Sequence, residues 1–205
     1  LKKARHKEIA KAQDLIVEEL YKVFDKAVLH GGTSIWRCYG GNRFSEDIDA
    51  YLPKDINKIN TLFDNLKNKG FNIIKKKIGE KSIFSNLELN REIVRFESIF
   101  KKVDGSLKEY TTIDGNLITV YTLTPEDMIK EKVGAYLKRL KERDIYDIFF
   151  LLRYVKDKNA VKRELKLLVD KFIVPVDEKE LRVLIIEGLV PNAQKMLEYI
   201  RHQLD

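Results

Sequence analysis

Two aspartates stand two residues apart in the segment SEDIDAYLP, at Asp47 and Asp49. Side chains two residues apart in a strand point to the same face, so an extended segment brings these two carboxylates together. Neighbouring carboxylates repel each other unless a cation lies between them. Mg²⁺ prefers such oxygen ligands and is commonly held by one or two carboxylates together with substrate phosphates. The pattern predicts a metal platform for phosphoryl-type transfer, and the competing interpretation is a turn cap at Asp47 with a water-facing Asp49.

A glycine pair precedes the acids in the segment LHGGTSIWRCYGG, at Gly31 and Gly32, and is followed by Thr33 and Ser34. Glycines let backbone N–H groups approach a phosphate closely, and a following helix N-terminus favours negative charge. The two hydroxyls can donate to phosphate oxygens, and one of them is expected to cap the helix. The segment is not a P-loop, because no lysine of the G-x-x-x-x-G-K-[ST] type follows. We therefore predict a phosphate cradle of a different kind.

Cations and acids alternate again in KEKVGAYLKRLKERDIYDIFFLL, residues 130–152. Lys132 and Arg139 are seven residues apart and share a helix face, and Asp144 and Asp147 share a face of the next helix. This arrangement fits one wall of a nucleotide pocket. It fits equally an ion-pair network that pins two helices into a hairpin. Upstream, Arg43 is suited to bidentate contacts with a triphosphate.

These segments together resemble the AbiEii/AbiGii toxin family of nucleotidyltransferases, within the DNA polymerase β-like nucleotidyltransferase superfamily. The first family pattern is a glycine pair with a hydroxyl residue, an arginine and S-x-D-x-D, here Gly31, Gly32, Thr33, Arg43, Ser45, Asp47 and Asp49. The second is a lysine, an alanine, an arginine and R-D-x-Y-D, here Lys132, Ala135, Arg139, Arg143, Asp144, Tyr146 and Asp147.

The resemblance implies roles for these residues. The glycine turn, with Ser34 and Arg43, would bind the nucleotide phosphates, and Asp47 and Asp49 would hold Mg²⁺. Lys132 would contact phosphate, while the residues around Arg139, Asp144 and Asp147 would shape the nucleotide or acceptor site. A third carboxylate is expected on a later strand, as a metal ligand or as the base. The segment IVRFESI nominates Glu97, and Glu88 in NLELN is its rival, because the register across a sheet cannot be set from sequence.

The elements that must position these residues indicate an α+β protein, with a nucleotidyltransferase-type mixed sheet and flanking helices followed by a C-terminal helical domain. We expect a catalytic domain at 1–123 and a helical domain at 124–205 that completes the nucleotide site. The first domain is predicted to hold helices at 8–24, 33–40 and 56–70 and strands at 26–30, 47–52, 71–77, 82–89, 92–100 and 116–123. From TPED onward the predicted elements are helices at 125–139, 143–156, 158–171, 177–188 and 191–203.

Composition limits the classes of partner and site. The formal net charge of +7 favours a polyanionic partner such as nucleic acid, or simply a lysine-rich surface. The cationic face of 158–171 leaves the same two interpretations open. The single Cys38 and three scattered histidines exclude an internal disulfide and a zinc site. No apolar run spans a membrane, and the first residues lack a signal-peptide pattern, so we expect a cytoplasmic protein.

The sequence therefore predicts a Mg²⁺-dependent nucleotidyltransferase that moves NMP from an NTP to an acceptor hydroxyl and releases pyrophosphate. The resemblance suggests the toxin of a toxin–antitoxin or phage-defence system, with a cognate antitoxin, and an RNA acceptor, including the 3′ end of tRNA. Two alternatives stay open. One is transfer to protein or to a small molecule, and the other is a non-catalytic nucleotide-binding module.

Overall fold

The computed structural model describes residues 4–177 and 180–204, which form two compact units. The sheet unit comprises the residues up to Gly40 together with Phe44–Thr122. The helical unit comprises Gly41–Arg43 and Leu123–Asp205. The short segment Gly41–Arg43 is therefore part of the helical unit, although it lies between two elements of the sheet unit in sequence.

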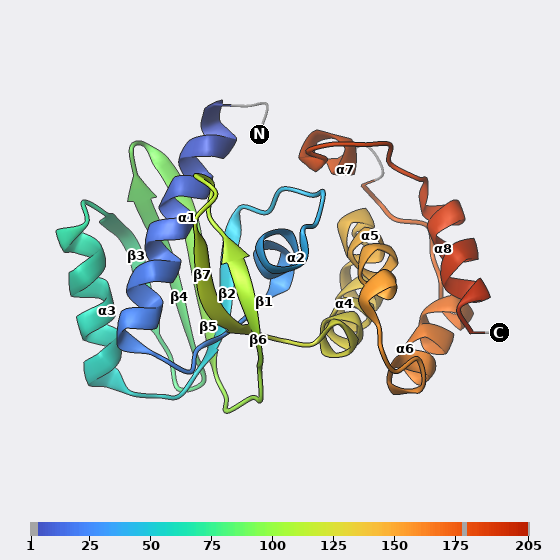
Figure 1. Cartoon of the computed structure of the whole chain (residues 1–205), viewed down its shortest axis with the longest axis horizontal. Helices are drawn as coiled ribbons and strands as arrows, with labels where there is room; N and C mark the ends of the chain where they lie inside the picture. Colours follow the sequence, from blue (N-terminus) through green and yellow to red (C-terminus); the bar gives the residue numbers. More distant parts are fainter. Residues whose placement is uncertain (1–3, 178–179, 205) are drawn as a thin grey trace. The chain divides into compact units, whose positions relative to one another are not determined.

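The sheet unit is built on a seven-stranded mixed sheet with the order β3-β4-β5-β2-β1-β7-β6 (Figure 1). Strand β2 lies near the middle, parallel to β5 on one side and antiparallel to β1 on the other, and β1 is parallel to β7. The strands are β1 (Val28–His30), β2 (Asp47–Leu52), β3 (Asn72–Ile78), β4 (Ser82–Leu89), β5 (Glu92–Phe100), β6 (Ser106–Thr111) and β7 (Leu117–Thr122).

Three helices complete this unit: α1 (Ala4–Val23), α2 (Gly31–Tyr39) and α3 (Ile56–Asn68). Figure 1 shows α1 and α3 side by side against one face of the sheet. Strand β2 turns Ile48, Ala50 and Leu52 into this core, where each is at most 1% exposed. Because side chains alternate along a strand, Asp47 and Asp49 belong to the opposite face of the sheet.

The helical unit contains α4 (Pro125–Arg139), α5 (Glu142–Leu151), the 3₁₀ turn η1 (Leu152–Tyr154), α6 (Asn159–Asp170), α7 (Glu180–Leu184) and α8 (Ala193–His202). Helix α4 begins as its sequence predicts, with Pro125 in the first turn and the Thr124 hydroxyl accepting from the Asp127 N–H. The segment Gly41–Arg43 joins this unit through backbone pairing, because the Ile186 N–H donates to the Asn42 carbonyl at 2.8 Å.

Several sequence predictions of local structure are wrong. Helix α2 begins at Gly31 with an extended His30 as its cap residue and no side-chain cap, so neither Thr33 nor Ser34 caps it. Strand β6 was missed because its side chains are mostly exposed and polar, which removes the apolar alternation of a half-buried strand. The helix predicted at 177–188 includes residues 178–179, which lie outside the described residues, and α7 already ends at Leu184. The helix predicted at 143–156 ends at Leu151 before a 3₁₀ turn.

Among the helices of the described residues, none combines the length and the apolar character that a membrane crossing needs.

Candidate active site

The acids of β2 lie in a row of polar side chains that crosses three neighbouring strands. Asp49 is in register with Glu97 of β5 and with His30 of β1, and Asp47 is in register with Arg95 of β5. Residues in register on neighbouring strands point to the same face and have Cβ atoms about 5 Å apart. The structure therefore places Asp47, Asp49 and Glu97 on one face of two neighbouring strands, with Glu97 directly beside Asp49.

Glu88 lies elsewhere on the sheet. Its register partners are Asn72 of β3 and Ile93 of β5, and it accepts a hydrogen bond from the Asn72 side chain at 3.1 Å. Four residues separate Ile93 from Glu97 along β5, which corresponds to about 13 Å of strand. The geometry therefore favours Glu97 over Glu88 as the third carboxylate beside Asp49.

Arg95 is the cation within this row of carboxylates. Its guanidinium donates to the Asp47 carboxylate, and its Nε lies 3.0 Å from Glu97 Oε1. Partial burial, followed by the nearby charges of Asp49 and Asp47, raises the pKa of Glu97, while Arg95 acts in the opposite direction. A carboxylate with a raised pKa is a better proton acceptor, which suits one of the two roles expected for the third carboxylate, metal ligand or base.

Gly31 makes room for the Asp49 carboxylate. Its φ of +73° belongs to the left-handed region, and a Cβ added there would lie 2.3 Å from Asp49 Oδ2. No residue with a side chain fits this position without moving the carboxylate. The glycine turn and the acid strand therefore meet in direct contact, and this contact explains why the motif needs glycine at this place.

The hydroxyl residues of the motif bind to other parts of the sheet unit. The Thr33 hydroxyl donates to the Asp47 carbonyl, which ties the start of α2 to the start of β2. The Ser34 hydroxyl forms a hydrogen bond with the Thr122 hydroxyl in the core. The Ser45 carbonyl accepts from the Gln13 side chain at 2.8 Å. These bonds hold the turn in place, so the backbone N–H groups are the donors best suited to an incoming phosphate.

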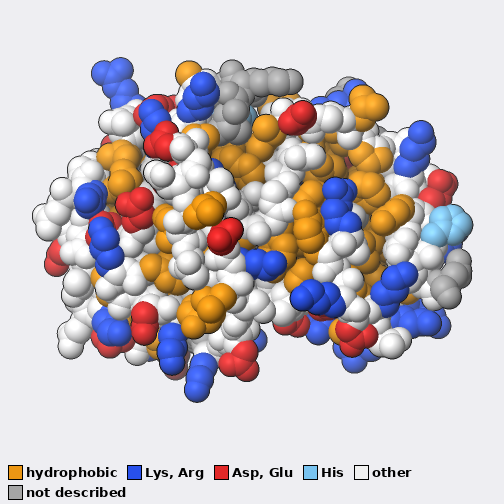
Figure 2. All heavy atoms as spheres, viewed as in Figure 1, with side chains coloured by type: hydrophobic (Ala, Val, Ile, Leu, Met, Phe, Trp, Pro, Cys, Tyr) orange, Lys and Arg blue, Asp and Glu red, His pale blue; other side chains and the backbone are white. Residues whose placement is uncertain are grey.

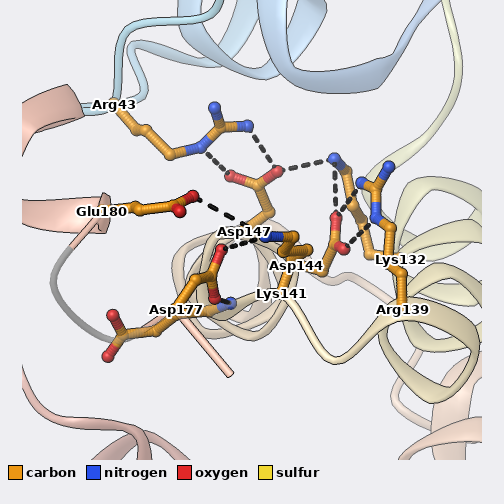
Figure 3. A network of polar contacts seen from close by, with 9 residues as sticks. Arg43, Lys132, Arg139, Lys141, Asp144, Asp147, Asp177 and Glu180 are labelled. Atoms are coloured by element: carbon orange, nitrogen blue, oxygen red, sulfur yellow. Dashed lines mark hydrogen bonds and ion pairs between the residues drawn. The ribbon is translucent and has the colours of Figure 1, made fainter. Parts of the chain in front are cut away.

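The second motif forms an ion-pair network inside the helical unit (Figure 3). Arg43 binds both oxygens of Asp147, at 2.8 and 2.7 Å. Lys132 Nζ lies 2.7 Å from Asp147 and 3.5 Å from Asp144, and Arg139 binds both oxygens of Asp144 at 2.6 and 2.7 Å. Cations and acids thus alternate from the segment 41–43 through α4 and α5.

Burial makes this network strongly coupled. Asp144 and Asp147 are at most 1% exposed. Burial alone would raise the pKa of the Asp147 carboxyl, but Arg43 and Lys132 outweigh it and lower the pKa to about 2. Removing one partner of a buried pair leaves an uncompensated charge, which costs about 3–5 kcal/mol. The network therefore stabilises the helical unit and fixes the segment that carries Arg43, whatever further role its members have.

Other residues of the site were not assigned from sequence. Arg95 belongs to the alternating basic and acidic strand that nominated Glu97, and this alternation was the signal for its position beside the acids. The Asp177 carboxylate accepts from the Glu142 N–H at 2.7 Å and so caps the start of α5 (Figure 3). It also lies 3.3 Å from Lys141 Nζ. No motif marked Asp177, because the partners that define it are distant in sequence.

The donor set of the acid row suits a hard divalent cation. Asp47, Asp49 and Glu97 offer carboxylate oxygens on one face of the sheet, and the Arg95 guanidinium shows that the row attracts positive charge. Across residues 4–177 and 180–204, no three His, Cys, Asp or Glu side chains are already drawn together as a metal cluster. The carboxylates fit Mg²⁺ by type, and binding would require Arg95 to leave Asp47 and Glu97 so that their oxygens can turn towards the ion.

Comparison with known proteins identifies the family of this chain and shows solved structures with a similar fold. The profile of the nucleotidyl transferase AbiEii toxin, type IV toxin–antitoxin system, matches residues 15–195. The nucleotidyltransferase toxin MenT4 from Mycobacterium tuberculosis superposes with a TM-score of 0.68 at 17% identity, covering 98% of this chain and 82% of that one. JHP933 from Helicobacter pylori gives a TM-score of 0.65 at 19% identity, covering 98% and 91% of the two chains. No protein of curated function matches the sequence.

Proposed function

The chain belongs to the AbiEii family of nucleotidyl transferase toxins, and on this basis we propose that it transfers a nucleoside monophosphate from an NTP to a hydroxyl of an RNA acceptor. As a member of this family the chain is a nucleotidyltransferase of a toxin–antitoxin system. The proposal adds the Mg²⁺ dependence, the residues that act and the class of acceptor. It also includes a cognate antitoxin as a partner and the cytoplasm as the place of action.

The reaction forms one bond and breaks another at the α-phosphorus. The acceptor oxygen attacks the α-phosphorus, the bond to the bridging oxygen of pyrophosphate breaks, and the acceptor hydroxyl loses its proton. Glu97 is placed beside Asp49 with a raised pKa, so it is the residue best suited to take that proton. Asp47 and Asp49 would hold Mg²⁺, which when bound neutralises charge on the phosphate oxygens.

The phosphates are assigned to the glycine turn. Gly31 and Gly32 open helix α2, whose first backbone N–H groups point out of the helix and are available to an anion. The Thr33 bond to the Asp47 carbonyl fixes this turn against the acid strand. For the helical unit, phosphate contact by Lys132 and Arg43, with shaping of the site by Arg139, Asp144 and Asp147, remains a prediction.

One observation supports the proposal most strongly: Asp49 is in register with Glu97 and packs directly on Gly31, with no space for a side chain between them. The acid pair, the third carboxylate and the glycine turn, each predicted from a different segment of the sequence, therefore meet at Asp49. Like charges side by side are destabilising unless a cation accompanies them. Arg95 is that cation in this structure, and Mg²⁺ would take this role when the nucleotide is bound.

The test is nucleotide transfer by Asp49→Asn, with Asp64→Asn on α3 as the matched control. Asp64 is exposed and pairs with Lys67 on the same helix, so its loss changes little. The protein is incubated with Mg²⁺, cellular RNA and each α-³²P-labelled NTP in turn. We expect Asp49→Asn to reduce labelling by about 10³-fold, as for loss of a group acting on transition-state charge. Urea unfolding of both variants separates a loss of activity from a loss of fold.

The same incubation separates the alternatives. Label in RNA supports the proposal, and label in protein or in a small molecule shows a different acceptor class. Labelling by Asp49→Asn at the wild-type rate would show that the acid row does not carry the reaction.

A further inference from the structure

A cavity opens on the sheet unit beside the acid row. It has a volume of 520 Å³, within the range of about 300–1,000 Å³ typical of ligand sites. Val28, Tyr51 and Tyr121 contribute to its lining from three neighbouring strands. These three residues are in register with one another, since Val28 pairs with Tyr51 on β2 and with Tyr121 on β7.

The cavity lies on the same face of the sheet as the acids. Asp49 and Tyr51 are two residues apart on β2, and His30 and Val28 are two residues apart on β1, so each pair shares a face. His30 and Tyr51 stack with their ring centroids 4.2 Å apart, which joins the acid row to the cavity. Two residues of strand correspond to about 7 Å, which places the cavity directly next to Asp49.

The cavity and the glycine turn lie on opposite sides of Asp49 along the strands. The turn follows His30 at the end of β1, whereas Val28 lies at the beginning of β1. In phosphoryl transfer the attacking and leaving oxygens are roughly in line with the phosphorus. If the leaving pyrophosphate lies against the glycine turn, the attacking hydroxyl approaches from the side of the cavity.

The chemistry of the lining suits an acceptor that carries phosphates and bases. Lys26, Lys101 and Lys102 are exposed at this cavity, and Asp104 is its acidic lining residue. Tyr121 is half-buried and offers an aromatic ring, and base–aromatic stacking contributes to the binding of single strands without regard to sequence. Figure 2 shows lysines and arginines interspersed with acids over the face that it draws, so overall charge alone does not select a site.

We propose that this cavity binds the 3′-terminal nucleotides of a single-stranded RNA acceptor and directs its terminal hydroxyl towards the acid row. The inference rests on the proposed nucleotidyl transfer and names the acceptor subsite of that reaction. The lysines contact backbone phosphates, and Tyr121 stacks on a base.

The test is direct binding of a 5′-fluorescein-labelled single-stranded RNA to the full chain, followed by fluorescence anisotropy at several salt concentrations. The variant is Lys101→Gln with Lys102→Gln, both on an exposed segment. The matched control is Lys162→Gln with Lys166→Gln on α6, which are also exposed and belong to the rival cationic face predicted from sequence. Binding of NTP is measured in parallel for each protein.

We expect the cavity variant to raise the Kd for RNA about tenfold and to leave the Kd for NTP unchanged. The slope of log Kd against log salt should fall by about 1.4, because each phosphate contact on a single strand contributes about 0.7. The control should bind RNA as the wild type does. RNA carrying 4-thiouridine at its 3′ end should photo-crosslink to the segment 101–105.

Equal RNA binding by the cavity variant and the wild type, or a loss confined to the α6 control, would overturn the inference. Wild-type protein that labels another protein and binds no RNA would also overturn it, while leaving nucleotidyl transfer intact. If the wild type transfers no nucleotide at all, the proposed function fails. The binding and crosslinking results then still decide whether the cavity holds RNA.

Discussion

Gly31 lies where the glycine turn meets the acid strand, so Gly31→Ala tests whether that contact matters for catalysis. The new Cβ would lie 2.3 Å from Oδ2 of Asp49, 3.1 Å from its Cγ and 3.2 Å from its Cβ. Rotation of the terminal oxygen alone does not relieve these contacts, so the whole carboxylate must move. A misplacement of about 1 Å can cost about 10²-fold in rate, and we expect a loss of that size in nucleotide transfer.

Gly40→Ala is the matched control for this experiment. Gly40 ends helix α2 with a φ of +67°, close to the +73° of Gly31, but an added Cβ at Gly40 meets nothing within 4 Å. The backbone strain of alanine in this region, about 1–2 kcal/mol, is therefore common to both variants. Urea unfolding followed by circular dichroism should show a loss of stability in both variants, larger in Gly31→Ala because of its overlap with Asp49. Gly40→Ala should keep its transfer rate within a few-fold of the wild type.

The comparison has a clear refuting result. If Gly31→Ala and Gly40→Ala transfer labelled nucleotide at the same rate, the position of the Asp49 carboxylate against the turn has no catalytic consequence. The assignment of Asp49 to the reaction would then fail, even though the fold and the family remain.

Two further predictions concern the charged clusters. Asp147→Asn should lower the free energy of unfolding by about 3 kcal/mol, because Arg43 and Lys132 lose a buried partner, and urea unfolding measures this loss. The folded pKa of Asp147 is about 2 and its ordinary value is 3.8, so the stabilisation is complete above about pH 4 and is lost as the pH falls through 2. The advantage of the wild type over Asp147→Asn should therefore shrink by about 2 kcal/mol across that window, and a constant difference would contradict it. Arg95→Gln should raise the affinity of the nucleotide-free protein for Mn²⁺ several-fold, measured by electron paramagnetic resonance, because the guanidinium competes for Asp47 and Glu97; an unchanged affinity would show that this row does not bind the ion.

The sequence predicted the elements whose pattern is local. Strand β2 was expected at 47–52 and is observed at Asp47–Leu52, because Ile48, Ala50 and Leu52 alternate with the acids and are buried. The α+β fold class, the toxin family and the nucleotidyltransferase activity are confirmed. The start of α4 was equally visible, since threonine, proline and acids in the first turn satisfy its free N–H groups within a few residues.

Features that depend on pairing between distant segments were not predictable. Glu97 and Glu88 are both acids on strands, and their difference is the register between β2 and β5, which brings Glu97 and not Glu88 beside Asp49. The cap of α2 was mispredicted for a similar reason. Thr33 and Ser34 have the right chemistry for a cap, but their hydroxyls bind the Asp47 carbonyl and Thr122.

Sequence spacing alone did not predict the roles of the cations in the two motifs. Arg43 and its acceptor Asp147 are 104 residues apart, so no local pattern distinguishes a phosphate ligand from an ion-pair partner. In this network Arg43, Lys132 and Arg139 pair with Asp144 and Asp147. The side chains of Arg43 and Lys132 are 5% and 10% exposed, and that of Arg139 is 43% exposed. Drawing either of the first two onto a phosphate would break a buried pair at a cost of several kcal/mol. Arg139 is the most exposed of the three, but moving it onto an anion would leave the fully buried Asp144 with Lys132 at 3.5 Å, so this change has a cost as well.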